Sequence, residues 1–355
     1  MSARLNTGGR LLNRDKSLEF TFNGKQLHGF QGDTLASALL ANDQMLMGRS
    51  FKYHRPRGVI ASGPEEPNAL MGIGADGRFE PNQRATTTEL FQRLTSHSQT
   101  HLPSLMFDVG AISNAFARLL PAGFYYKTFM APRAAWKHLF EPAIRMSAGL
   151  GKAPKDKDLD HYEHFHVHVD VLVIGGGIAG LHAARVAGAA GAKILLIEQS
   201  AQWGGRAPVD GVEIDGMPAE TWVSNAVQIF DNTPNMYAHL RCTGTGIYDH
   251  GYALAYERIA DHTPGDGRPR HRLWRIRARQ IVTATGAIER PLSFAGNDIP
   301  GVMLASAVRD YLINHAVSVG ARTVVVTNND DAYLTAIALK KAGLAVPVIL
   351  DARRS

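Results

Sequence analysis

Cysteine is almost absent from this sequence, and long uninterrupted apolar runs are missing. The 355 residues include one cysteine, Cys242, which excludes an internal disulfide and any iron–sulfur or metal site built only from cysteines of this chain. Residues 1–16 contain no apolar core, so we expect no signal peptide. The most apolar segment, residues 169–197, is interrupted by glycines and by Arg185, which argues against a membrane span. We therefore expect a cytoplasmic protein with a reduced thiol and no membrane partner.

A strong excess of charge of one sign is also lacking. The formal net charge is +6, and the basic residues are scattered along the chain. Nucleic-acid-binding domains usually gather Lys and Arg on one face, so we expect no nucleic-acid partner. His164, His166 and His168 alternate and would share one face of a strand. Because no further ligand stands beside them, an exposed strand edge is favoured over a metal site, and we predict no bound metal.

The N-terminal hundred residues have the pattern of a small β-grasp domain. Residues 17–30 alternate apolar and polar side chains around Asn23-Gly24, a strong β-hairpin pattern. Asp33 or Thr34 can then cap a helix that runs to about residue 41. We predict a ferredoxin-like β-grasp domain over residues 1–100 that lacks cluster cysteines. Residues 101–165 are expected to be a linker with short helices broken by prolines.

A dinucleotide-binding pattern begins at residue 169. A β-branched strand over 169–174 precedes three glycines, and a helix over 181–190 with Ala183, Ala184 and Ala187 toward the sheet follows them. A second strand over 193–197 ends in an acidic residue. Strand, glycines, helix, strand and acid in this order are far more specific than the glycines alone.

The glycines and the acid have separate physical roles. Gly175 permits the tight turn, Gly177 lets a pyrophosphate approach the backbone, and Gly180 lets helix and strand pack closely. The helix N-terminus offers unpaired N–H groups to the phosphates. Glu198 can accept hydrogen bonds from the two ribose hydroxyls, and its charge would repel a 2′-phosphate. NAD or FAD is therefore favoured over NADP.

Further downstream segments are expected to return to the same nucleotide. Gly205 and Arg206 follow the acidic strand end, where a loop can wrap the cofactor. A bend at Gly244 between two strands could set backbone against an adenine. A strand over 279–284 ends in Thr285 and Gly286, which would bring the chain back to the cofactor.

The segment 323–351 repeats the pattern of strand, turn, helix and strand without its glycines. Asn328, Asp330 and Tyr333 stand where the first unit has its three glycines. Asp351 lies as far beyond Tyr333 as Glu198 lies beyond the last glycine. Two carboxylates would repel a pyrophosphate and a tyrosine would fill its space, so we predict a structural unit without a nucleotide. A rearranged nucleotide site stays open as the alternative.

The N-terminal hundred residues contain the stretches "GDTLASALLAN", "SFKYHRPRG" and "GPEEPNAL", and the second dinucleotide unit is degenerate. Through these features the chain resembles the α subunits of heterotetrameric sarcosine oxidases over nearly its whole length. This resemblance implies partner β, γ and δ subunits, with sarcosine oxidised by FAD on the β subunit. It also implies an FMN at the α/β interface, NAD held by the α subunit, and a tetrahydrofolate site in a C-terminal half. Because the chain ends within the second unit, the resemblance implies a fragment or truncated form.

The resemblance also implies a fold and a set of contacts. The fold class would be α/β, a two-dinucleotide FAD/NAD(P)-binding Rossmann-type domain over 166–355 after the β-grasp domain. In the basic segment 49–57, a subunit interface or a flavin phosphate is favoured over a solvated loop. NAD contacts would fall on matching positions: Gly175, Gly177, Ile178, Gly180, Ile197, Glu198, Gln199, Gly205 and the region of Gly244.

Three other interpretations stay open. One is a subunit of a related FAD-dependent amino-acid or opine dehydrogenase, whose β-grasp domain would carry a [2Fe–2S] cluster and need four cysteines. Another is a stand-alone FAD/NAD-linked reductase, which would need a redox disulfide or a second nucleotide site. The third is a β-grasp adaptor with the nucleotide fold as scaffold. No residue is a persuasive catalytic acid, base or nucleophile, so the catalytic residues stay unknown and substrate chemistry is expected on another chain.

Overall fold

The fold comes from a computed structural model that describes residues 3–127, 129 and 131–353. Contacts divide the chain into two units, Met1–Leu159 together with Glu289–Ser355, and Asp160–Ile288. Each unit is described by itself. Among the described residues, no helix has the length and apolar character needed to cross a bilayer.

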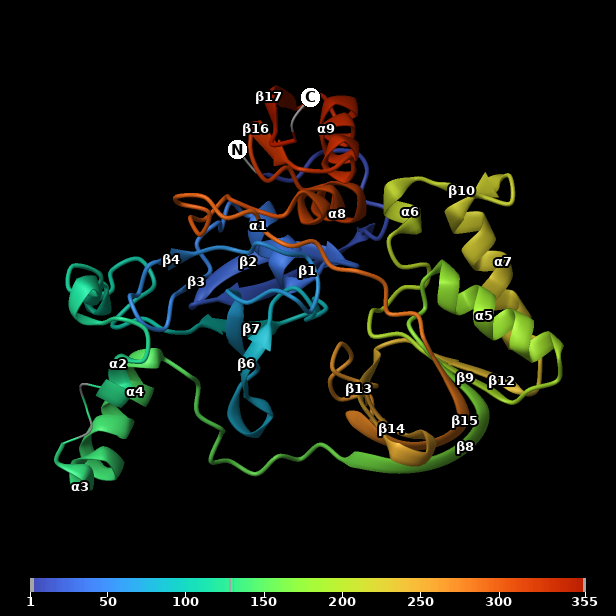
Figure 1. The fold of residues 1–355 in the computed structure, drawn as a ribbon, viewed down its shortest axis with the longest axis horizontal. Helices are drawn as coiled ribbons and strands as arrows, with labels where there is room; N and C mark the ends of the chain where they lie inside the picture. The colour runs from blue at the N-terminus through green and yellow to red at the C-terminus, as the bar shows by residue number, and fades with distance from the viewer. Residues whose placement is uncertain (1–2, 128, 130, 354–355) are drawn as a thin grey trace. The chain divides into compact units, whose positions relative to one another are not determined.

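The first unit is built on a β-grasp sheet (Figure 1). The expected hairpin is confirmed, because Asn23 and Gly24 both take positive φ between its two strands. The capped helix is confirmed as well, since the Thr34 hydroxyl accepts the Ser37 N–H and all seven helical residues are buried. The sheet runs in the order β2 (Lys25–Gln31), β1 (Asn13–Phe22), β7 (Leu94–Ser98), β5 (Leu70–Ile73) and β6 (Glu80–Arg84), and the helix is α1 (Leu35–Ala41).

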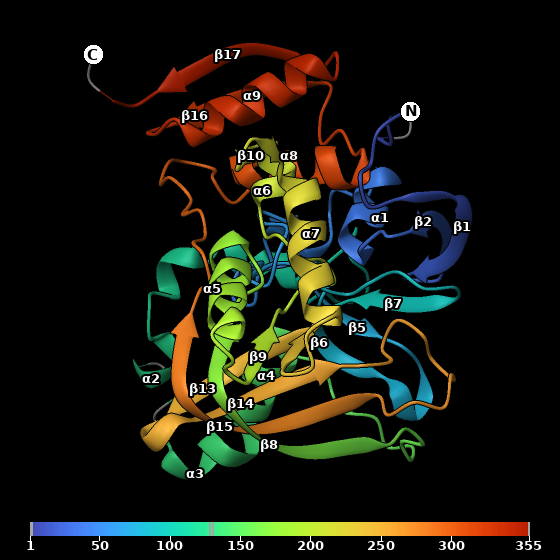
Figure 2. The same ribbon diagram turned by 90° about the vertical axis from the view of Figure 1, so that its right-hand side faces the viewer.

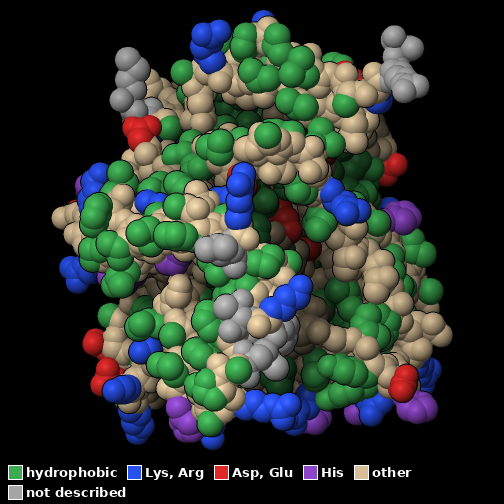
Figure 3. Space-filling view, turned by 60° about the vertical axis from the view of Figure 1, so that its left-hand side comes forward, with side chains coloured by type: hydrophobic (Ala, Val, Ile, Leu, Met, Phe, Trp, Pro, Cys, Tyr) green, Lys and Arg blue, Asp and Glu red, His purple; other side chains and the backbone are tan. Residues whose placement is uncertain are grey.

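Short helical pieces follow the sheet, as the prolines led us to expect. Figure 3 shows hydrophobic side chains spread over one face. Among the residues that follow the sheet, Met106, Phe107 and Ile112 are 81%, 69% and 68% exposed. The short elements of the first unit are β3 (Gly48–Arg49), β4 (Pro56–Arg57), η1 (Asp76–Arg78), η2 (Val109–Asn114), η3 (Ala117–Leu119), α2 (Phe124–Lys127), α3 (Arg133–Ala135), η4 (Trp136–Phe140) and α4 (Glu141–Ala148).

The C-terminal elements group with the β-grasp sheet, which differs from the expectation that residues 166–355 form one domain. The reason is a long-range apolar contact: Ala307 and Tyr311 are buried in the core of the first unit, and the Tyr311 hydroxyl donates to the Ala61 carbonyl at 3.0 Å. The strand–helix–strand echo is present, and its two strands pair in parallel. These elements are α8 (Ala305–His315), β16 (Arg322–Thr327), α9 (Asp331–Lys341) and β17 (Ala345–Asp351).

The second unit contains a six-stranded sheet with helices on one face (Figure 2). Four strands are parallel and the last two form an antiparallel hairpin. The strand order is β12 (Met236–His239), β9 (Ile194–Ile197), β8 (Tyr162–Ile174), β15 (His271–Thr283), β14 (Tyr252–Arg258) and β13 (Cys242–Tyr248). The remaining elements are α5 (Ile178–Ala189), α6 (Ala207–Asp210), β10 (Glu213–Ile214), β11 (Met217–Pro218), α7 (Ala219–Asp231) and η5 (Asp249–Gly251).

Opposite faces of this sheet bury different cores. Val173 packs with Leu181 of α5 on the helical face, whereas the neighbouring Leu172 packs with Ile276 on the other face. Of the three alanines expected toward the sheet, only Ala184 is fully buried. The helix begins three residues earlier than predicted, so its buried line is Gly180, Leu181, Ala184 and Gly188. These cores fix the carboxyl ends of β8 and β9, where the predicted site lies.

Candidate dinucleotide site

The glycine turn after β8 is shaped by close backbone contacts. Gly175 has a φ of +110°, and a Cβ there would lie 2.3 Å from the Ala284 carbonyl oxygen. A Cβ on Gly180 would lie 1.8 Å from the Gly175 carbonyl oxygen, so α5 can approach the turn only because residue 180 has no side chain. Gly177 is the N-cap of α5, and a Cβ there would meet nothing within 4 Å. The helix N-terminus is therefore open at Gly177, as binding of a pyrophosphate there would require.

The acid at the end of β9 stands against this turn. Glu198 Oε2 accepts the Gly176 N–H at 2.6 Å, and Oε1 accepts the Ser200 N–H at 2.8 Å. The Trp203 ring packs against Gly176, since a Cβ on Gly176 would lie 2.5 Å from the ring. The carboxylate is half-buried beside the phosphate space, which suits it to bind the hydroxyls of an adenosine ribose.

The loop after β9 lies over the start of α5. The Gly204 N–H donates to the Gly176 carbonyl at 2.8 Å, and a Cβ on Gly205 would lie 3.3 Å from the Gly177 Cα. Gly205 therefore reaches the turn, as the sequence indicates. Arg206 caps α6 and forms an ion pair with Asp210 at 3.1 Å.

The expected bend at Gly244 is wrong. Gly244 lies inside β13, where it pairs with Ala255 across a bulge, and the chain turns earlier, between β12 and β13. Hairpin pairing with β14 decides this and not the local glycine content. The position still matters, because a Cβ on Gly244 would lie 3.1 Å from Ile174 and 3.6 Å from Ile197 at the strand ends.

The chain does return to the turn after β15. The Ala284 N–H donates to the Ile174 carbonyl at 2.8 Å, and the Thr285 nitrogen lies 3.2 Å from an ideal Cβ on Gly175. Gly286 follows with a φ of +71°. The remaining predicted residues flank the site: Ile178 is the first residue of α5, Ile197 is buried at the end of β9, and Gln199 is exposed and accepts Arg258 Nη2 through its carbonyl at 3.2 Å.

Sequence reasoning missed three groups at the turn. Gly176 supplies the N–H that meets the acid, Trp203 covers the turn, and Ala284 closes it directly after β15. Gly204, which the sequence placed in the loop that can wrap the cofactor, joins that loop to the turn. Gly176 is visible in the sequence as a member of a glycine run. Trp203 and Ala284 have no local pattern that marks them, because both reach the turn through the tertiary fold.

The second dinucleotide-like segment has a different arrangement at the equivalent place. The Tyr333 hydroxyl donates to Asp351 Oδ2 at 3.0 Å, so it occupies the carboxylate that would meet a ribose. Arg353 bridges that carboxylate and Asp330, at 2.7 Å and 2.8 Å. The hydrogen bonds from Arg353 hold the pKa of Asp351 well below its usual range. These contacts support the prediction that this segment binds no dinucleotide, which stays a prediction.

The only cysteine is no nucleophile. Cys242 is buried, and burial, with the nearby Glu257 charge, raises the pKa of its thiol far above the usual range. The thiolate is the reactive form, so this side chain stays inert at neutral pH. No group of three or more His, Cys, Asp or Glu side chains able to hold a metal occurs among the described residues, and the strand histidines 164–168 form none.

Two family descriptions match parts of the chain. Residues 15–101 match a 2Fe-2S iron-sulfur cluster binding domain, and residues 170–241 match an FAD dependent oxidoreductase. Residues 15–101 contain no cysteine, and clusters of this kind are held by cysteine thiolates. The residues present therefore do not fit a [2Fe–2S] cluster, although the β-grasp fold is the one that the description implies.

A solved structure shares the fold. L-proline dehydrogenase from P. horikoshii superposes with a TM-score of 0.62 over 96% of this chain and 55% of that one, at 21% identity. This likeness supports the fold class, an α/β Rossmann-type domain preceded by a ferredoxin-like domain, and nothing more specific.

Full-length relatives are much closer in sequence. The alpha subunit of sarcosine oxidase from Rhizobium meliloti (strain 1021) is 48% identical over 97% of this chain and 35% of the relative, and that from Corynebacterium sp. (strain U-96) is 36% identical over 98% and 32%. An opine oxidase subunit from Rhizobium meliloti (strain 1021) is 26% identical over 51% of the chain. The chain spans about a third of the length of the first two relatives. It is a homologue of the N-terminal portion of the sarcosine oxidase alpha subunit.

Proposed function

We propose that this chain is the nucleotide-holding part of the α subunit of a sarcosine oxidase and that it binds NAD in the turn after β8. The observation that carries the proposal is the contact between Glu198 and the Gly176 N–H at 2.6 Å. It sets a carboxylate beside the helix N-terminus, so that ribose and pyrophosphate can be bound together. A nicotinamide dinucleotide supplies hydride transfer where a substrate can reach it.

The chain's own residues account for binding and not for substrate chemistry. Gly177 and the start of α5 would hold the pyrophosphate, Glu198 the ribose, and Gly205, Gly244 and Thr285 would surround them. The buried Cys242 offers no nucleophile. We therefore infer that sarcosine is oxidised on a partner chain, with FAD on a β subunit, and that FMN lies at the interface with it.

The assembly and its setting belong to the same proposal. Partners would be β, γ and δ subunits in the cytoplasm, and tetrahydrofolate would bind a part of the relatives that this chain does not span. The exposed Met106, Phe107 and Ile112 support a partner surface on the first unit, since monomers rarely leave large apolar patches open. Nucleic acid is not expected among the partners.

FAD in place of NAD is the second candidate. The match of residues 170–241 to an FAD dependent oxidoreductase favours it, and a ribose-binding carboxylate serves either dinucleotide. The nucleotide released on denaturing the purified protein, identified by its mass, distinguishes the two.

Oxygen uptake tests where the substrate is oxidised. The full-length protein would be assayed with sarcosine, alone and together with its partner chains. We expect oxygen consumption only when the flavin-carrying partner is present. Sarcosine oxidation by the full-length protein alone would overturn the assignment of substrate chemistry to another chain.

A further inference from the structure

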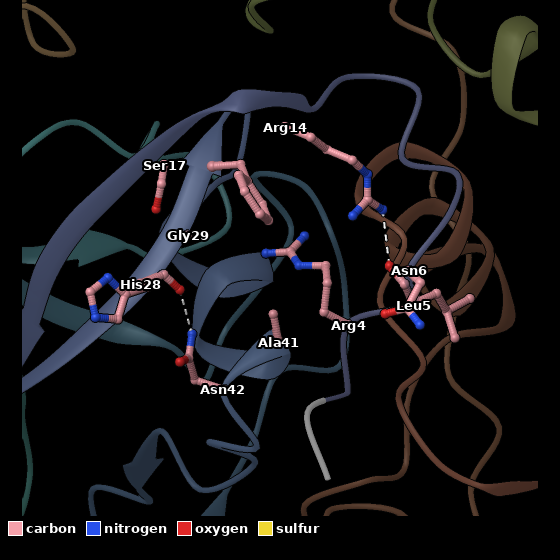
Figure 4. A pocket seen from close by; sticks show the side chains of 10 residues that line it. Arg4, Leu5, Asn6, Arg14, Ser17, His28, Gly29, Ala41 and Asn42 are labelled. Atoms are coloured by element: carbon pink, nitrogen blue, oxygen red, sulfur yellow. Dashed lines mark hydrogen bonds between the residues drawn. The ribbon is translucent and has the colours of Figure 1, made fainter.

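A cavity lies in the first unit, in the β-grasp domain (Figure 4). Its volume is about 360 Å³, and its polar lining includes Arg4, Arg14, His28 and Asn42. No carboxylate occurs among the described residues that line it. We call this cavity the arginine pocket. Its size is within the range of pockets that hold metabolites, and it is much larger than one water or one bare ion needs.

Three parts of the chain meet at the arginine pocket. Arg4 comes from the N-terminal segment, Arg14 from the start of β1, and Phe30 from the end of β2. Both arginine side chains extend toward the same space (Figure 4). The two guanidinium carbons lie 5.6 Å and 5.9 Å from the centre of the Phe30 ring, so the ring holds both cations near the cavity.

The two arginines differ in their counter-charge. Arg4 is nine-tenths buried and forms an ion pair with Asp33 through both terminal nitrogens, at 3.0 Å and 2.7 Å. Arg14 donates only to the carbonyls of Leu5 and Gly8, at 2.9 to 3.2 Å. No described carboxylate pairs with Arg14, and its Nη1 donates to no described residue. One fixed positive charge at the pocket is therefore not neutralised within the described chain.

We propose that the arginine pocket binds a metabolite-sized organic anion and that Arg14 pairs with its carboxylate or phosphate group. The geometry meets the needs of such a ligand: a fixed guanidinium with donors left over, no acid in the described lining, and room for a carbon skeleton. Guanidinium groups favour both oxyanions because their planar N–H donors match two oxygens. This site lies apart from the glycine turn in sequence and in fold unit, and it does not depend on the nucleotide proposal.

Titration calorimetry on the full chain tests the proposal, with citrate as the carboxylate probe and glycerol 3-phosphate as the phosphate probe. Ionic strength is held constant with sodium chloride. We expect saturable binding of at least one probe, and the probe that binds identifies the anion class. Arg14→Gln should raise its dissociation constant roughly tenfold or more. Arg118→Gln is the matched control, because it removes an exposed positive charge of the same unit outside the pocket.

Arg14 also donates hydrogen bonds to the N-terminal segment, so its replacement can change the structure as well as the charge of the pocket. Two variants of Ser17 change the charge alone. Ser17 lines the pocket, is exposed, and its side chain forms no hydrogen bond with the described residues. We expect Ser17→Glu to weaken the bound probe and Ser17→Lys to strengthen it, each severalfold and in opposite directions, without a change in thermal stability. Absence of binding by both probes, or an equal response of both Ser17 variants, would overturn the proposal.

Discussion

The most discriminating perturbation of the nucleotide site is Gly177→Ala. A Cβ at this position meets nothing within 4 Å, and the backbone φ of −71° suits any residue. The free protein should therefore accept the methyl group, with an unfolding free energy within about 1 kcal/mol of the wild type, the usual effect of Ala at a helix N-cap. The same methyl would stand in the space that we assign to the pyrophosphate.

Crowding of a close-packed contact costs about 1–3 kcal/mol, so the dissociation constant for NAD should rise roughly 5- to 150-fold. Calorimetric titration of the nucleotide-stripped protein measures this change, and urea unfolding measures stability. Gly320→Ala is the matched control, because its nearest neighbour, the Arg322 carbonyl, would lie 3.8 Å from the new methyl. If Gly177→Ala bound NAD as tightly as the wild type, the pyrophosphate would not lie where we place it.

Three other changes have definite expected outcomes. Gly180→Ala places a methyl 1.8 Å from the Gly175 carbonyl oxygen. The free energy of unfolding in urea should therefore fall by about 1–3 kcal/mol, and NAD binding should be lost. Unchanged stability would contradict the close contact between α5 and the turn. Glu198→Gln should weaken NAD about tenfold and reduce the discrimination against NADP, measured by titrating both dinucleotides; an unchanged preference would exclude the ribose contact. Burial lowers the pKa of His315 to about 4, so the folded state keeps this ring neutral while the unfolded chain protonates it below about pH 6.5. The unfolding free energy should thus fall by up to about 3 kcal/mol between pH 6.5 and 4, and His315→Gln should reduce that fall; an equal fall in the variant would assign it to other groups.

Local chemistry predicted the site well where neighbouring residues decide the conformation. Asn23-Gly24 turns the first hairpin, and Thr34 caps the helix after it. Gly175 and Gly180 lie where the turn and the close helix contact require them. Each of these features depends on backbone torsions or hydrogen bonds within a few residues. Residue type and spacing in the sequence are therefore enough to predict them.

Prediction failed where pairing or packing between separate elements decides the structure. Gly244 was expected to mark a bend, yet pairing with β14 extends it into a strand. Tyr311 brings its helix into the core of the first unit, a contact that no local pattern specifies. Trp203 reaches the glycine turn only through the folded loop after β9. The apolar character of a residue predicts that it will be buried, but it does not predict which residues it will pack against.

The absence of cysteine is more informative than the family description that covers the β-grasp domain. Residues 15–101 match a cluster-binding domain but lack every cysteine ligand. The core of this domain is formed instead by apolar side chains such as Phe20, Leu39 and Leu94, all nearly fully buried. The fold of this domain is thus accounted for by packing, without a metal cluster.

In the proposed function, one turn of this chain holds one NAD. The direct measurement is the identity and amount of nucleotide released when the full-length protein, purified with its partner chains, is denatured. We expect one NAD per chain from the wild type and less from Gly177→Ala. FAD released from this chain, or two dinucleotides per chain, would contradict it.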